Sequence, residues 1–285
     1  MVRMKNGGGI VWPKGTRIAV MITFDYDAWL LRQSRIGENT PLIFADWSRG
    51  MYGPDEGFER CFRVLKEHQI PATFFVPGKI AEEYPDHIRR LAAAGHEVGY
   101  HGYLHESRKG MSREEELECM VKSEQILQEL TGSAPVGHRA PFGVLQKSSF
   151  QLMRERGYLY SSSMKDRDWA YLHEAGRPIV EIPNEMTNDD YTYFYYSLVT
   201  PSHRVAYTND YVLDIWKEEF DALAAEKDKV YCLKLHPQMI GRASRIKMLG
   251  ELIDYMRFKG AWIATCKDVA QYVLNHTTVG EGDQL

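Results

Sequence analysis

Short apolar runs alternate with amphipathic stretches along the chain. The first run, residues 17–24 (RIAVMITF), is continuous and ends in acidic residues, a pattern typical of a strand buried on both faces. Similar runs follow at residues 72–76, 96–100, 229–235 and 261–265. We predict a strand at each of them.

Apolar residues at helical spacing fill the intervals between these runs. They predict helices over residues 58–68, 80–94, 112–127, 246–256 and 267–274. The third helix opens with a capping box, Ser112-x-x-Glu115. Strand–helix alternation repeated about seven times indicates a parallel sheet, either closed into a barrel or open and doubly wound. Since no linker or change of composition interrupts it, we predict one domain over residues 1–285.

Two long connections break the alternation. Residues 28–54 are rich in Trp, Tyr and Arg, and residues 164–209 mix acids, aromatics and prolines. Long loops inside a compact α/β domain are more often functional than idle, so we expect both to form walls around a substrate. The second contains a dense aromatic run, residues 191–196, which fits a subunit interface and a pocket wall equally well.

Charge and composition narrow the classes of partner. A formal net charge of -4 provides no basic footprint, so we expect no nucleic-acid partner. No apolar run approaches the roughly 18 residues that a membrane span needs. Gly7, Gly8 and Gly9 stand where a signal peptide would have its apolar segment, so we expect a cytoplasmic protein. The four cysteines are far apart, without C-x-x-C, and are expected to be free thiols.

The first strand ends in two carboxylates, Asp25 and Asp27. Residues two apart on a strand face the same way, so both can point into one cavity. Helix capping or loop solvation is the alternative for an isolated acidic pair. The functional interpretation therefore depends on the ends of the other strands.

Two histidines follow the third strand, His101 and His105. Histidines four apart can converge on one metal ion from a single helical turn or a tight loop. The zinc metalloprotease motif has the same spacing but requires Glu after the first His, and Gly102 occupies that position here. A metalloprotease is therefore excluded.

Two further strand ends have polar residues, Arg139 and His236. In a TIM-like barrel the carboxyl ends of several strands supply the catalytic groups. Four such ends in one chain are more than a purely structural protein requires. Together they predict an active site on that face of the sheet.

In this order the motifs F-D-x-D, H-x-x-x-H, R-x-P-F and L-x-L-H-P resemble those of the polysaccharide deacetylase superfamily (NodB-homology, or carbohydrate esterase family 4, proteins). The resemblance covers about residues 14–273. Further positions resemble a subset that contains allantoinase-like proteins, cyclic imide hydrolases and peptidoglycan deacetylases: residues 48–53, 71–73, 101–106, 181–183 and 189–190. The resemblance implies an α/β fold of the NodB-homology type, a distorted TIM-like (β/α)7 barrel.

The resemblance also implies a metal site. Asp27, His101 and His105 would be the ligands, with positions left open for water and substrate. The wider family has its two acids adjacent, whereas Tyr26 separates them here, a spacing that the subset shares. We expect Zn²⁺ or another divalent metal; activity without metal, as thought for some ureide-hydrolysing members, is the alternative. No organic cofactor is expected.

The remaining roles follow from the same resemblance. Asp25 would be the general base and His236 the general acid that protonates the leaving nitrogen. Arg139 would hold Asp25 in place, and the backbone N–H of Phe142 would stabilise the oxyanion. Asp166 would support these groups without contacting the substrate.

These expectations describe a hydrolase of non-peptide C–N bonds, acting on a small cytosolic amide, cyclic imide or ureide. One alternative is an N-deacetylase of N-acetylglucosamine-containing glycan, either peptidoglycan or chitooligosaccharide. Another is a catalytically silent ligand-binding barrel, which the presence of both Asp25 and His236 disfavours. The subset also implies a homo-oligomer. We expect the partners to be a small-molecule or amino-sugar substrate and other copies of the chain, with no membrane.

Overall fold

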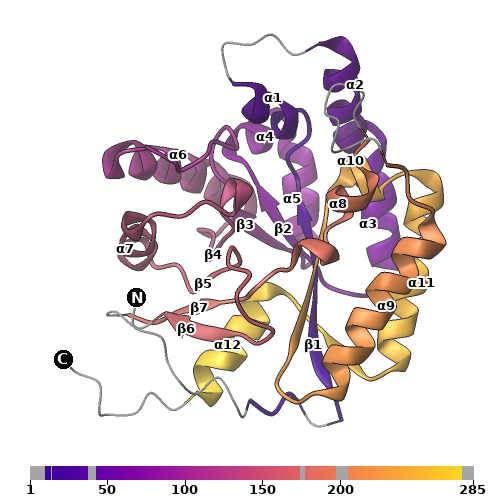
Figure 1. Ribbon diagram of the computed structural model, residues 1–285. Helices are drawn as coiled ribbons and strands as arrows, with labels where there is room; N and C mark the ends of the chain where they lie inside the picture. The colour runs from indigo at the N-terminus through magenta and orange to yellow at the C-terminus, as the bar shows by residue number, and fades with distance from the viewer. Residues whose placement is uncertain (1–9, 14, 38–42, 174–176, 197–204, 278–285) are drawn as a thin grey trace.

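The computed structural model describes residues 10–13, 15–37, 43–173, 177–196 and 205–277. One twisted sheet forms its centre, in the strand order β6-β7-β5-β4-β3-β2-β1-β8, with β9 also paired to β1 (Figure 1). The strands are β1 (Ile18–Asp25), β2 (Thr73–Val76), β3 (Glu97–Tyr100), β4 (Gly137–His138), β5 (Tyr160–Ser161), β6 (Tyr171–His173), β7 (Ile179–Glu181), β8 (Val230–Leu235) and β9 (Ala261–Ile263). All pairings are parallel except β6 with β7.

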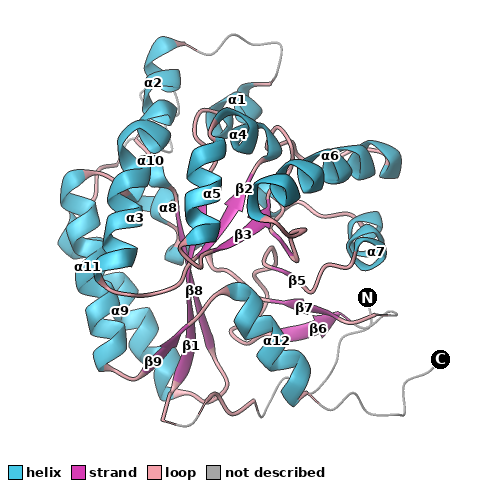
Figure 2. Cartoon of the chain, turned by 180° about the vertical axis from the view of Figure 1, so that it is seen from behind, coloured by secondary structure: helices cyan, strands magenta, loops and turns pink. Residues whose placement is uncertain are grey.

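Helices cover the outside of the curled sheet, as the view from behind shows (Figure 2). They are α1 (Leu30–Ile36), α2 (Phe44–Tyr52), α3 (Phe58–Glu67), α4 (Gly78–Glu83), α5 (Pro85–Ala93), α6 (Arg113–Thr131), α7 (Lys147–Arg156), α8 (Asp190–Phe194), α9 (Asn209–Ala225), α10 (Pro237–Ile240), α11 (Ala243–Phe258) and α12 (Cys266–His276). This arrangement confirms the predicted distorted (β/α)7 barrel.

Strand β1 lies between β2 and β8 and is buried along its whole length. Its side chains alternate between two apolar clusters, as the period of two along a strand requires. Ile22 and Phe24 belong to the cluster that contains the helices α3, α9 and α11, and Met21 belongs to the other cluster. Asp25 continues the Met21 face. The alternation thus directs the Asp25 carboxylate away from α3, α9 and α11.

The predicted elements agree with the structure except in three segments. The helix expected over residues 80–94 is two helices, because Tyr84 leaves helical geometry and Pro85 begins α5. The connection 28–54 contains α1 and α2, and the connection 164–209 contains β6, β7 and α8. Residues 38–42, 174–176 and 197–204 of these connections, and Gly7 to Gly9, lie outside the described residues.

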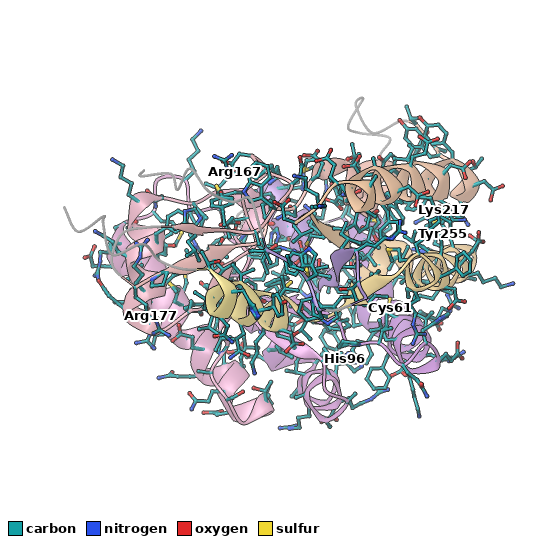
Figure 3. All side chains as sticks on the ribbon, turned by 90° about the horizontal axis from the view of Figure 1, so that it is seen from below. Cys61, His96, Arg167, Arg177, Lys217 and Tyr255 are labelled. Atoms are coloured by element: carbon teal, nitrogen blue, oxygen red, sulfur yellow. The ribbon has the colours of Figure 1, made fainter. Side chains whose placement is uncertain are left out.

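The outer helices pack mainly through apolar side chains, with polar groups at their rims. From below, Lys217 of α9 and Tyr255 of α11 are neighbours at the outer edge (Figure 3), with the ammonium 5.1 Å from the ring centroid. Helices α1, α2 and α10 lie in the upper part of the molecule in Figure 1, above the carboxyl ends of the strands. None of the described helices is both long and apolar enough to span a membrane.

Candidate active site

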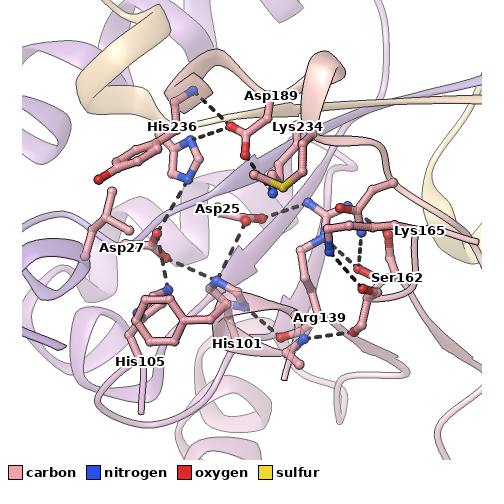
Figure 4. Close-up of a pocket in the computed structure, with 18 of the residues that line it drawn as sticks. Asp25, Asp27, His101, His105, Arg139, Ser162, Lys165, Asp189, Lys234 and His236 are labelled. Carbon is pink, nitrogen blue, oxygen red and sulfur yellow. Dashed lines mark hydrogen bonds and ion pairs between the residues drawn. The ribbon is translucent and has the colours of Figure 1, made fainter. Parts of the chain in front are cut away.

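A cavity of about 140 Å³ opens at the carboxyl ends of the strands. Residues that follow β1, β3, β4 and β8 converge there, and α1 and α8 complete the wall (Figure 4). Seven of the eight residues proposed from the sequence line it: Asp25, Asp27, His101, His105, Arg139, Phe142 and His236. The four strand ends identified in the sequence therefore meet at one place.

Asp27, His101 and His105 form one buried group. The Nε2 atoms of the two histidines lie 3.4 and 3.6 Å from the two carboxylate oxygens of Asp27. One potential ligand atom from each residue lies within 4.8 Å of the others. Burial raises the pKa of Asp27 to about 6, although His101 and His236 oppose this rise. A buried carboxylate in this setting requires a cation to compensate its charge.

Neighbouring groups orient both histidine rings. His101 Nδ1 lies 2.7 Å from the carbonyl oxygen of Arg139, so Nδ1 donates its proton and Nε2 keeps its lone pair. His105 Nδ1 lies 2.8 Å from Ser34 Oγ. Since the Ser34 hydroxyl donates to the Leu30 carbonyl, also at 2.8 Å, its oxygen accepts from His105. Both Nε2 atoms are thus prepared to bind a metal.

Asp27 distinguishes a metal site from an ordinary polar cluster. Both of its carboxylate oxygens are buried and have no hydrogen-bond donor among the described residues. In a second acidic group, Asp189 and Asp190 with His236, potential ligand atoms also lie within 4.8 Å of one another. There the carboxylates are already satisfied, because Lys234 Nζ lies 2.7 Å from Asp189 and His236 donates twice to Asp190. A divalent cation therefore fits at Asp27 and not at Asp189.

Arg139 fixes Asp25 opposite this metal site. Its Nη1 donates to Asp25 Oδ1 and to Thr23 Oγ1, both at 2.8 Å, and its other nitrogens bond to Ser162. Burial alone raises the pKa of Asp25, but nearby positive charges, led by Arg139, hold the pKa well below its usual range. Asp25 is therefore ionised at neutral pH, and its Oδ2 does not take part in the Arg139 bond.

His236 lies on the other side of Asp27, with its Nε2 3.8 Å from Asp27 Oδ2. Asp190 accepts hydrogen bonds from the His236 backbone N–H and from Nδ1, at 2.9 and 2.7 Å. Burial lowers the pKa of His236, but Asp190 and then Asp189 more than offset it and raise the pKa to about 9. His236 is therefore protonated at neutral pH, while Asp25 is not.

The loop after β4 brings Phe142 to the cavity. Phe142 has a φ of +59°, unusual for a residue other than glycine, and its backbone N–H has no acceptor among the described residues. Its ring packs edge-on against His105, with centroids 4.8 Å apart. The strained turn thus leaves an N–H available for a ligand and covers His105 with an aromatic ring.

The structure does not bring Asp166 to the cavity. It is exposed and accepts a hydrogen bond from the Tyr171 hydroxyl at 2.8 Å. Asp190 and Ser34 support the site instead, and sequence reasoning assigned no role to either. The sequence marks the Asp189-Asp190 pair only through its resemblance to the family subset. No sequence motif marks Ser34 as functional, because it is a single serine in a segment that the sequence predicts to be a loop.

The aromatic run at 191–196 belongs mostly to the interior. Tyr191 lines the cavity, and Tyr193 and Phe194 join the main apolar cluster. Tyr195 stacks on Tyr191 with ring centroids 4.4 Å apart. The pocket-wall interpretation therefore holds for Tyr191, and packing within the chain explains the next three aromatic residues.

Several known proteins are similar to this chain in sequence and fold. The family model described as polysaccharide deacetylase matches residues 14–161. A peptidoglycan deacetylase of Helicobacter pylori is 28% identical over 283 residues, covering 89% of this chain and 95% of that protein. A protein of Mycobacterium smegmatis assigned to the polysaccharide deacetylases is 31% identical in its crystal structure, with a TM-score of 0.86 and 93% of each chain covered. The crystal structure of Puue allantoinase, 27% identical, has a TM-score of 0.81 over 93% of each chain.

Proposed function

Since this chain belongs to the polysaccharide deacetylase family and is a hydrolase of non-peptide C–N bonds, we propose that it hydrolyses a small amide, cyclic imide or ureide with a divalent metal, most favourably Zn²⁺. The observation that supports a metal is Asp27, whose two buried oxygens have no donor and face two oriented histidines. Two His and one carboxylate are a ligand set typical of catalytic zinc. Such an ion would polarise the carbonyl and lower the pKa of water.

Asp25 and His236, which lie on opposite sides of Asp27 in the cavity, carry out the two proton transfers. Asp25 Oδ2 takes the proton from the attacking water, while Arg139 keeps the carboxylate in place. His236 donates its Nε2 proton to the leaving nitrogen, and Asp190 stabilises the charged ring. The Phe142 N–H donates to the carbonyl oxygen as negative charge develops on it. A base that is ionised and an acid that is protonated at neutral pH are the combination that amide hydrolysis requires.

Cavity size supports a small substrate. A volume of about 140 Å³ is below the roughly 300 Å³ where pockets for drug-sized ligands begin. Arg35 of α1 and Tyr191 of α8 stand on its wall, from the two long connections expected to enclose a substrate. The similarity to Puue allantoinase over 93% of each chain supports a ureide as the substrate class.

A screen of purified protein tests this proposal. Hydantoins, succinimide-type imides, allantoin and N-acetylglucosamine oligomers would be compared, each with added Zn²⁺ and after confirmed removal of metal. We expect the highest kcat/KM on an imide or ureide and a large loss on metal removal. Full activity of metal-free protein would contradict the metal assignment, and a clear preference for the oligomers would contradict the substrate class.

The Helicobacter pylori relative favours a second candidate, N-deacetylation of an amino-sugar glycan. That peptidoglycan deacetylase matches over 95% of its length, so the likeness is not confined to one motif. The same base, acid and metal ligands would serve an N-acetyl group. The screen distinguishes the two candidates, because released acetate reports glycan deacetylation and ring opening reports imide hydrolysis.

A further inference from the structure

Two cations on the wall of the cavity have no acidic partner in the described part of the chain. Arg35 of α1 and Lys165, which follows β5, both line the cavity. No described carboxylate oxygen lies within the 4.0 Å of an ion pair from either charged group. The other arginine and the other lysine on the wall are neutralised, Arg139 by Asp25 at 2.8 Å and Lys234 by Asp189 at 2.7 Å, and protonated His236 is paired with Asp190 at 2.7 Å.

Two aromatic rings hold Arg35 in place. Its guanidinium carbon lies 5.4 Å from the centroid of the Phe142 ring and 4.7 Å from that of Tyr191. No described residue accepts a hydrogen bond from the N–H groups of Arg35. The Arg35 guanidinium, held beside two aromatic rings with its N–H groups available, is suited to bind a carboxylate.

Lys165 lies beside the loop that contains Phe142 and Gly143. Its Nζ donates to the Ser163 carbonyl at 3.2 Å and lies beside Gly143, where a Cβ atom would come within 2.8 Å of it. Partial burial, together with Lys234 and Arg139, lowers the pKa of Lys165. Arg35 contacts Phe142 and Lys165 contacts Gly143, so the two cations flank the loop that carries the Phe142 N–H.

We propose that the substrate carries a carboxylate beside the bond that is cleaved, and that Arg35 and Lys165 receive it. The inference rests on the proposed function and narrows its substrate class to imides, ureides or N-acyl compounds that are also acids. A neutral cyclic substrate of the same size would offer no negatively charged partner to Arg35 and Lys165, which would then be solvated by water. In a chain whose net charge is -4, unpaired cations at this wall favour an anion locally.

A matched pair of substrates tests the proposal through catalysis. Hydantoin-5-acetate and hydantoin-5-acetamide differ in charge but hardly in shape. We expect kcat/KM to be higher for the acid by about tenfold, the scale of one charge-assisted hydrogen bond at a partly exposed site. The preference should be lost in Arg35→Gln and reduced in Lys165→Gln. Arg49→Gln is the matched control, because Arg49 also lies over a tyrosine ring, 5.0 Å from Tyr195, but does not line the cavity.

A binding measurement makes the result independent of turnover. Calorimetry on the Asp25→Asn variant compares succinamate, which has one carboxylate, with succinamide, which has none. Tighter binding of succinamate that disappears when Arg35→Gln is added supports the proposal. If no imide is hydrolysed, that result contradicts the proposed function but leaves the carboxylate site supported. Equal binding of the two ligands overturns the proposal. So does a succinamate preference that persists when Arg35 and Lys165 are both replaced by Gln.

The source of the carboxylate is distinguished by a second pair, N-acetylmuramic acid and N-acetylglucosamine. Only the first sugar has a carboxylate. A carboxylate preference confined to the hydantoin pair supports a small acidic ring as substrate. A preference for the carboxylate found only in the sugar pair would still support carboxylate binding by Arg35 and Lys165. It would identify an amino sugar that carries a carboxylate as the substrate.

Discussion

At the scale of single residues, the site separates two carboxylates that are only two positions apart. Arg139 neutralises Asp25 directly, whereas Asp27 has no donor and lies among histidines. Opposite pKa shifts follow, with that of Asp25 lowered and that of Asp27 raised to about 6. Similar residues therefore differ in charge state because of their surroundings, which supports the two roles proposed for them, Asp25 as the ionised base and Asp27 as a metal ligand.

Asp25→Asn tests the role of the base. The change preserves shape and an acceptor for Arg139 but removes the proton acceptor, so we expect kcat to fall by about 10² or more. The variant should keep its fold and its metal, because the Asp25 carboxylate lies outside the group formed by Asp27 and the two histidines. Circular dichroism and elemental analysis provide those controls. A kcat within a few-fold of wild type would remove Asp25 from the mechanism.

Asp190→Asn tests the acid through pH dependence. Only protonated His236 can donate, so activity should be lost as pH rises through its pKa, which Asp190 helps to raise to about 9. Without that carboxylate the pKa falls, and the alkaline limb of the kcat profile should move to lower pH. Asp166→Asn is the comparison, since Asp166 is exposed and bonded to Tyr171. An unchanged limb in Asp190→Asn, or an equal shift in Asp166→Asn, would contradict this assignment.

At the scale of elements, the strand ends were predictable and the helices above them were not. Asp25, Asp27 and His101 directly follow or end buried apolar runs, so the sequence pattern locates them at one edge of the sheet. Ser34 and His105 are 71 residues apart, and Asp190 and His236 are 46 apart. Those contacts depend on how α1 and α8 fold over the strand ends. The segments that contain these helices lacked the apolar spacing that predicts a helix.

Ser34→Ala tests the contribution of α1 to the metal site. The substitution removes the group that accepts the His105 Nδ1 proton, so the ring loses its orientation. We expect metal affinity to fall by about 10- to 100-fold, as measured by competition with a fluorescent chelator. Ser48→Ala in α2 is the control, since among the described residues the Ser48 hydroxyl donates to the Ala45 carbonyl and does not contact either histidine. Equal metal affinities in the two variants would show that α1 does not support the site.

At the scale of the whole molecule, β1 joins the two ends of the chain. It pairs with β8 and β9, which are late in the sequence, as well as with β2. We therefore propose that the whole chain forms one domain and expect a single cooperative unfolding transition in urea. Circular dichroism and tryptophan fluorescence should give the same midpoint. Two separate transitions would indicate independently stable parts.

The surface of the molecule also determines whether copies of the chain associate. The aromatic run at residues 191–196 is mostly buried, so it does not provide the interface. Helix α2 instead exposes Ile43 before its start and then Phe44 and Trp47, with 87% and 42% of the two aromatic residues exposed. Phe44 and Trp47 contact each other edge to face, with centroids 6.4 Å apart, and form an exposed apolar patch. Helix α2, which contains both residues, lies at the upper edge of the molecule in Figure 1. A patch of this kind is better placed in a subunit interface than in water.

We therefore expect light scattering at micromolar concentration to give a mass well above the 32.9 kDa of one chain. Replacing both Phe44 and Trp47 by Ser should shift the mass toward that of the monomer, because the interface would lose its central apolar contacts. Phe258→Ser is the matched control, since Phe258 is also 87% exposed but lies at the end of α11. A wild-type mass near 32.9 kDa would refute assembly, and an unchanged oligomer in the double variant would exclude α2 as the interface.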